Sequence, residues 1–96
     1  MTTLIEIKTK IKSHKDILFK KYALSFIAIF GSYSSGKQTE ESDVDILVEF
    51  NKPIGIEFID LAEELEKVLN IKVDLVSKRG IKPAYLQQIE KELIYV

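Results

Sequence analysis

The sequence contains no cysteine and no tryptophan, and its 96 residues include only two prolines, four glycines and one histidine. Without cysteine the chain has neither a disulfide framework nor a cysteine-based zinc site, which is typical of a reducing cytoplasm. The low proline and glycine content, with 46% hydrophobic residues, excludes a collagen-like or disordered chain. We therefore expect a cytoplasmic protein that folds as a single domain over residues 1–96.

An excess of positive charge is also missing. The chain has 14 Lys and Arg against 15 Asp and Glu, a formal net charge of −1, and Arg79 is its only arginine. Proteins that neutralise nucleic-acid phosphates carry a basic excess, and arginine is the usual reader of base edges. We therefore expect no direct nucleic-acid binding. The first residues lack the apolar run of a signal peptide or a membrane span, so no membrane association is predicted.

The apolar residues follow helical and strand periods in turn. Five of them recur at helical spacing near the start: Leu4, Ile7, Ile11, Leu18 and Tyr22. Thr3 and Glu6 form a capping box at the beginning of this series. Helices are predicted over residues 4–21, 55–69 and from Pro83 onward, and strands over 24–30, 43–50 and 71–76. This α-β-β-α-β-α order predicts the α/β (α+β) class. Residues 31–42 form the only long irregular segment, which marks them for a function.

A phosphate-binding P-loop is one hypothesis for that segment. Gly31, Gly36 and Lys37 match the first three fixed positions of G-x-x-x-x-G-K-[ST], directly after an apolar strand. The signature needs a hydroxyl after the lysine to hold Mg²⁺, and Gln38 occupies that position. Too few residues follow for the helix whose amides cradle the phosphates. The P-loop hypothesis therefore fails on two independent grounds.

The aspartates offer a different hypothesis. The chain has five, and three of them lie on predicted strands, where aspartate is disfavoured. Asp43 and Asp45 project from one face of a strand, about 6 to 7 Å apart, and Asp74 lies on a strand expected beside it. Taken singly, each could be a turn residue or an edge charge. Together with the Gly31-Ser32 turn they favour a shared site for two Mg²⁺ ions, or Mn²⁺, because hard oxygen ligands suit these cations.

These residues carry a resemblance to a known family. Gly31-Ser32, Ser42-Asp43-x-Asp45-Ile46-Leu47-Val48 and Val73-Asp74-Leu75 resemble the motifs of the minimal nucleotidyltransferases of the DNA polymerase β superfamily. The resemblance covers nearly the whole chain. It implies the nucleotidyltransferase fold, a small mixed β-sheet packed with helices. It also implies two divalent ions and transfer of a nucleoside monophosphate, AMP from ATP, to a hydroxyl acceptor.

The resemblance also implies a role for each motif residue. Asp43 and Asp45 would bind both metal ions, and Asp74 would bind the catalytic ion and serve as base for the attacking hydroxyl. Gly31 and Ser32 would hold the triphosphate. Many family members have Ala-Arg where this chain has Ser34-Ser35, so a charged contact to phosphate is missing, and Lys37 from the same loop could substitute for it.

From the small size we expect no second domain that could bind an acceptor. Family members commonly pair with HEPN-domain toxins, so the resemblance implies an antitoxin in a hetero-oligomer that modifies a tyrosine of a HEPN ribonuclease. The departure at Ser34-Ser35 motivates an alternative, an inert antitoxin that neutralises its partner by binding alone. Transfer to an antibiotic or another small molecule is a weaker hypothesis, since such enzymes usually add a second domain.

Three further features have open interpretations. His14 continues the apolar stripe of the first predicted helix and is interpreted as a packing residue, not as a ligand or base. Tyr33 either packs on its own turn or stacks on a nucleobase. The basic cluster, Lys78, Arg79 and Lys82, is either a solvated helix entrance or a surface that faces the triphosphate or a partner.

Overall fold

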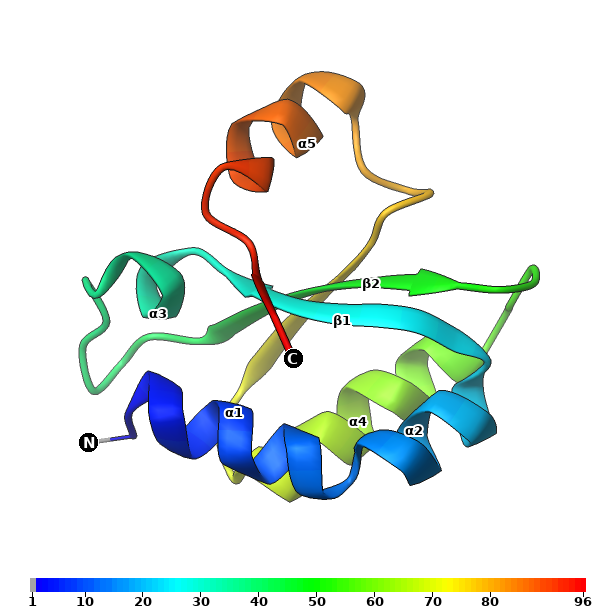
Figure 1. Ribbon diagram of the computed structural model, residues 1–96, viewed down its shortest axis with the longest axis horizontal. Coiled ribbons are helices and arrows are strands. Elements are labelled where there is room, and N and C mark those ends of the chain that lie inside the picture. Colours follow the sequence, from blue (N-terminus) through cyan, green and yellow to red (C-terminus); the bar gives the residue numbers. More distant parts are fainter. Residues whose placement is uncertain (1) are drawn as a thin grey trace.

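The structure, a computed structural model that describes residues 2–96, contains a mixed four-stranded sheet with helices on both faces (Figure 1). The strand order is β3-β2-β1-β4. In chain order the elements are α1 (Leu4–Ser13), α2 (Lys15–Tyr22), β1 (Leu24–Phe30), α3 (Ser32–Ser35), β2 (Val44–Phe50), α4 (Glu57–Leu69), β3 (Val73–Ser77), α5 (Pro83–Glu90) and β4 (Ile94–Tyr95). The predicted fold class, a small mixed sheet packed with helices, is confirmed.

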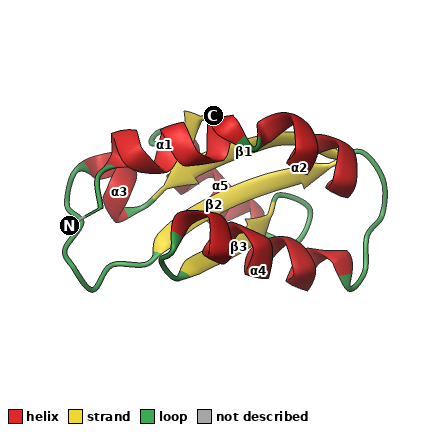
Figure 2. Ribbon diagram, turned by 90° about the horizontal axis from the view of Figure 1, so that it is seen from below, coloured by secondary structure: helices red, strands yellow, loops and turns green. Residues whose placement is uncertain are grey.

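Strand direction follows from the connections. β1 pairs antiparallel with both β2 and β4, whereas β2 and β3 are parallel and are joined by the crossover helix α4. α1, α2 and α4 cover one face of the sheet, and α5 covers the other (Figures 1 and 2). Over residues 2–96, no helix is both long and apolar enough to cross a bilayer.

Two apolar clusters hold these layers together. On the three-helix face, alternate residues of β1 and β2, such as Ile29 and Ile46, pack in one core with Ile11 and Leu65. On the α5 face, Phe30, Leu47 and Ile89 form a smaller cluster. Because successive strand residues point to opposite faces, β1, β2 and β3 each supply both clusters. Phe30 of the α5 cluster is also the register partner of Asp45, so the cluster borders the end of β2 where the aspartates lie.

The prediction of one helix over residues 4–21 is wrong, because the helix breaks at His14. The hydroxyl of Ser13 donates to the Lys10 carbonyl at 2.8 Å, and His14 Nδ1 lies 3.0 Å from the same oxygen. These side chains occupy the carbonyl that the His14 N–H would bond in a continuous helix, and that N–H bonds Ile11 instead. Ile11 and Leu18, on either side, are still fully buried. His14 is exposed and does not continue their stripe.

Two short elements were absent from the predicted order. Residues 31–42 contain the one-turn helix α3, which lies between Gly31 and Gly36, both at positive φ, and is anchored by the buried Tyr33. The chain then ends in the strand β4, whose two residues pair with Ala28 and Ile29 of β1. The observed order is therefore α-α-β-α-β-α-β-α-β. A single helical turn and a two-residue strand are both too short to produce a periodic pattern.

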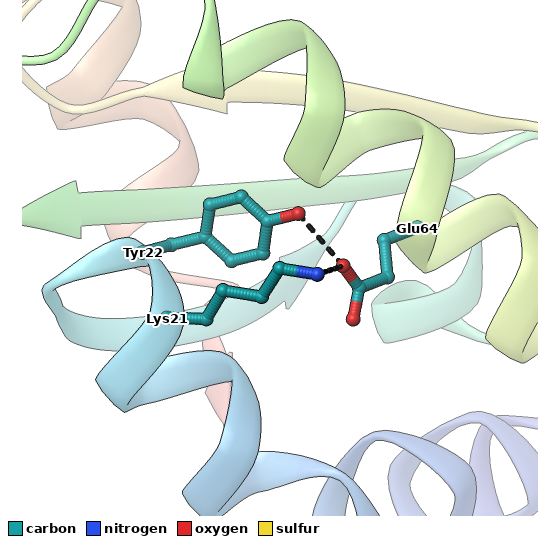
Figure 3. A network of polar contacts seen from close by, with 3 residues as sticks. All are labelled: Lys21, Tyr22 and Glu64. Carbon is teal, nitrogen blue, oxygen red and sulfur yellow. Dashed lines mark hydrogen bonds and ion pairs between the residues drawn. The ribbon is translucent and has the colours of Figure 1, made fainter.

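A polar contact ties α2 to α4 across the helical layer (Figure 3). Glu64 Oε1 accepts the Tyr22 hydroxyl at 2.7 Å and the Lys21 ammonium at 2.9 Å. These bonds lower the pKa of Glu64, and burial together with the bond to Glu64 raises the pKa of Tyr22. Glu64 is therefore held as an ionised acceptor between the two helices.

Candidate active site

Residues from neighbouring strands form a row across one end of the sheet. Phe30 of β1 is the register partner of Asp45 of β2, and Asp45 is the register partner of Asp74 of β3. Adjacent strands lie about 4.8 Å apart, so the two carboxylates start from backbone positions one strand spacing apart. Gly31 directly follows Phe30 at the end of β1. The structure therefore brings Gly31, Asp45 and Asp74 together, as the sequence predicted.

Asp43 belongs to the same end of the sheet. It immediately precedes β2, and Val44 and Ile46 are fully buried in the core on the three-helix face. The strand alternation turns Asp45 and Leu47 to the α5 face, where Leu47 joins the smaller cluster. Asp43 stands two residues before Asp45 and its charge acts on that carboxyl. That Asp43 projects from the same face as Asp45 stays a prediction, because β2 begins only at Val44.

Gly31 adopts a backbone conformation that other residues rarely reach. Its φ is 76° and its ψ is −146°. Its carbonyl accepts the Ser35 N–H at 3.1 Å and the Ser34 hydroxyl at 3.3 Å, which close the turn of α3. A Cβ at this position would overlap Oδ2 of Asp45. Glycine is thus required both by the turn and by the carboxylate packed against it.

Glu92 is a fourth acidic residue that sequence reasoning missed. The Gly31 N–H donates to Glu92 Oε1 at 3.0 Å, across 61 positions of sequence. Glu92 lies in the turn between α5 and β4 and is half-buried. The available signal was an acid directly before the apolar residues Leu93 and Ile94, a context similar to that of Asp43 before β2. All four strands therefore bring residues to this end of the sheet.

The acidic residues perturb one another. Burial, the charge of Asp74, a hydrogen bond with Asp74 and the charges of Asp43 and Glu92 together raise the pKa of Asp45 to about 6. A like charge nearby disfavours ionisation, as does loss of water around the carboxyl group. The site is therefore electrostatically unfavourable until a cation balances it.

The carboxylate oxygens at this site suit Mg²⁺ when a substrate supplies the remaining ligands. The carboxylates beside Asp45 are hard oxygen ligands, but over residues 2–96 no three acidic, histidine or cysteine side chains are arranged to hold a metal ion alone. Mg²⁺ is usually held by one or two carboxylates plus substrate phosphates and water, not by a complete protein cage. Asp45 and Asp74 therefore suit an ion that arrives with a phosphate-bearing substrate.

The other predicted binding residues lie in or after α3. Ser32 opens α3 and is half-buried, and its carbonyl accepts the Lys37 N–H at 2.9 Å. The Lys37 side chain is exposed, as is Ser35. Ser32 is thus the residue after Gly31, which lies against Asp45. Lys37, from the same loop, is exposed to solvent.

The structure decides between the two roles considered for Tyr33 and shows where Lys78 and Arg79 of the basic cluster lie. Tyr33 is 2% exposed and packs in the core on the three-helix face, which leaves no free ring face for a nucleobase, and burial raises its pKa. Its interpretation as a packing residue is confirmed, although it packs in the main core. Lys78 and Arg79 line a cavity of about 410 Å³ at the far end of β3, with Lys78 Nζ 3.7 Å from Glu49. Lys78 directly follows β3 and is four residues, about 13 Å of extended chain, from Asp74.

Comparisons with known proteins agree with this geometry. A family model described as a nucleotidyltransferase domain matches residues 11–96. A Methanocaldococcus jannaschii protein, provisionally named a protein adenylyltransferase, is 52% identical over the full length of both chains. A solved structure of a candidate minimal nucleotidyltransferase superposes with a TM-score of 0.86 at 27% identity, covering 99% of this chain and 97% of the other.

A further solved structure contains a partner. The MNT antitoxin in complex with the tri-AMPylated Shewanella oneidensis HEPN toxin superposes with a TM-score of 0.68 at 26% identity. The match covers 93% of this chain and 70% of the matched chain.

Proposed function

The chain belongs to the nucleotidyltransferase domain family, and on that premise we propose that it transfers AMP from ATP to a hydroxyl group of a partner protein. The observation that carries the proposal is the register pairing of Asp45 with Asp74 beside Gly31. This arrangement combines a turn that only glycine can form with two adjacent carboxylates. It is the combination that a metal-dependent transfer to or from a triphosphate requires.

Each residue has an assigned task. Asp43, Asp45 and Asp74 would together hold two Mg²⁺ ions, or Mn²⁺, and these ions would neutralise phosphate charge and polarise the α-phosphate. Gly31 allows the backbone to approach the triphosphate, and the Ser32 hydroxyl donates to a phosphate oxygen. Lys37 adds a positive charge from the exposed part of the same loop.

The reaction is an in-line substitution at phosphorus. The acceptor hydroxyl oxygen bonds the α-phosphorus of ATP, the bond from that phosphorus to the bridging oxygen breaks, and pyrophosphate leaves. The hydroxyl proton passes to a carboxylate, a task we assign to Asp74. Most of the rate enhancement comes from positioning and charge neutralisation, because the protein forms no covalent bond to the nucleotide.

The acceptor proposed is a tyrosine of a HEPN-domain ribonuclease toxin, which the modification inactivates in a hetero-oligomer. Support comes from the relative named as an adenylyltransferase and from the related complex that contains an AMPylated HEPN toxin. The proposal places the reaction in the cytoplasm, which supplies ATP.

The direct test first identifies the neighbouring reading frame that encodes a HEPN-domain protein, and then combines that purified protein with the purified chain. After incubation with ATP and Mg²⁺, intact-mass spectrometry should show that the partner gains one or more AMP groups. The variant carrying Asp43→Ala and Asp45→Ala should add none. No gain of mass with the wild-type chain, when both proteins are folded, would contradict the proposal.

A second candidate function is neutralisation by contact alone. It is favoured by Ser34 and Ser35, which stand where many family members have Ala-Arg and remove a charge-assisted phosphate contact. The same double aspartate variant distinguishes the two. If it still neutralises the partner ribonuclease as fully as the wild type, contact and not transfer is the function.

A further inference from the structure

We propose that Glu92 is a positioning residue for the transfer reaction, in which its carboxylate holds the Gly31 N–H and so fixes the turn that follows β1. The inference rests on the proposed function and extends it to a residue outside the recognised motifs. Its basis is the 3.0 Å hydrogen bond from Gly31 to Glu92 Oε1.

With this bond, the peptide groups on both sides of Gly31 are held by hydrogen bonds. On the carbonyl side, Ser35 and Ser34 donate to the Gly31 oxygen. On the amide side, the Phe30 residue is the last in β1, and Glu92 supplies the acceptor for the next N–H. Gly31 stands at φ 76° and ψ −146°, a region that a free glycine leaves readily. These three bonds together hold Gly31 against Asp45 and orient Ser32.

Glu92 is itself held from two directions. Its own N–H donates to the Ile89 carbonyl at 3.0 Å, and Ile89 is buried in the cluster beneath α5. Two residues later, Ile94 pairs with Ile29 of β1. The carboxylate is therefore positioned by both α5 and β4. Through it, hydrogen bonds join the C-terminal segment to the turn at Gly31.

The useful feature of Glu92 is its acceptor oxygen, not its charge. The carboxylate adds a fourth negative charge near Asp43, Asp45 and Asp74, where the substrate brings an anionic triphosphate. Such a charge opposes substrate binding. Glutamine keeps an oxygen in the same place without the charge, so it should retain the positioning function, whereas alanine should lose it.

The experiment compares Glu92→Ala and Glu92→Gln with the wild type, and Glu90→Ala, at an exposed position two residues away, is the matched control. Glu92→Ala should lower kcat/KM for ATP by about ten- to a hundredfold, the effect of a misplaced binding group. Glu92→Gln should stay close to the wild type, as should Glu90→Ala. Wild-type kinetics in Glu92→Ala, or equal loss in Glu92→Gln and Glu92→Ala, would overturn the inference.

A second readout does not depend on activity. Amide hydrogen exchange followed by NMR should show the Gly31 N–H protected in the wild type and in Glu92→Gln, and at least about tenfold faster exchange in Glu92→Ala. Unchanged Gly31 exchange in Glu92→Ala would overturn the inference by itself. If the wild type transfers no AMP, the proposed function fails, and the Gly31 exchange still decides whether Glu92 fixes this turn.

Discussion

Asp45 of β2 and Asp74 of β3 are register partners in a parallel pair of strands, so two carboxylates face the same side of the sheet one strand spacing apart. Their proximity, with burial as the larger cause, raises the pKa of Asp45 to about 6. A fold selected for stability alone would not place two acids there. The relationship therefore predicts a conflict between stability and function at this end of the sheet.

Asp45→Asn should make the protein more stable and less active. The folded state binds more protons than the unfolded chain between pH 3.8 and about 6, so the wild type loses stability as the pH rises through this window. Without divalent ions at pH 7, Asp45→Asn should raise the free energy of unfolding by on the order of 1 kcal/mol, after allowance for solvent screening. Urea denaturation in EDTA measures this.

Asp60→Asn is the control for that experiment. Asp60 lies in the first turn of α4, where a negative charge interacts favourably with the helix dipole, so its removal should leave stability unchanged or slightly lower. Equal stabilisation by Asp45→Asn and Asp60→Asn would mean that the gain reflects general charge reduction and not the paired carboxylates.

Gly31→Ala should abolish transfer and destabilise the fold. Its backbone conformation costs a non-glycine residue about 1 to 3 kcal/mol, and the added Cβ meets Asp45 Oδ2. Gly36→Ala is a matched control, because Gly36 also has positive φ but a Cβ there has no heavy atom within 4 Å. Both variants should be less stable than the wild type, and only Gly31→Ala should be inactive. Activity in Gly31→Ala would exclude this turn from the site.

The periodic parts of the structure could be predicted from sequence, and the contacts between distant segments could not. The strand from Leu24 to Phe30 and the shared face of Asp45 and Leu47 follow from side-chain alternation, which is a local property. The bond from Gly31 to Glu92 joins positions 61 residues apart, and no spacing rule encodes it. The break at His14 was missed because it depends on side chains that compete for one backbone carbonyl.

Glu64→Gln should destabilise the helical layer in a pH-dependent manner. The bonds from Tyr22 and Lys21 lower the pKa of Glu64 below its ordinary value of 4.5, so their contribution is complete above that pH and is lost as the pH falls through the lowered value. At pH 7 we expect a loss of about 1 to 2 kcal/mol in the free energy of unfolding. The difference from the wild type should shrink below pH 4.5.

Urea denaturation at several pH values tests this, with Glu63→Gln as the control. Glu63 is the exposed neighbour of Glu64 on α4, and its substitution should change stability by less than about 0.5 kcal/mol at every pH. A Glu64→Gln penalty that stays constant from pH 7 to pH 3 would contradict the assigned titration.

Removal of divalent ions should prevent nucleotide binding. With Mg²⁺, ATP at a hundredfold its dissociation constant should stabilise the folded chain by about 2 to 3 kcal/mol, and with EDTA the gain should largely disappear. The variant Asp43→Asn with Asp45→Asn should show no gain in either condition. Thermal melting followed by circular dichroism measures all three, and equal stabilisation by ATP with and without Mg²⁺ would contradict the metal assignment.

We propose that the carboxylates at this end of the sheet direct transfer of the nucleotide and not of a terminal phosphate. The decisive experiment incubates the chain and the proposed HEPN-domain partner with Mg²⁺ and ATP labelled at either the α- or the γ-phosphate. Label should appear on the partner only from α-labelled ATP, and it should be absent with Asp45→Asn. Transfer from γ-labelled ATP, or undiminished α-label with Asp45→Asn, would contradict this role of the carboxylates.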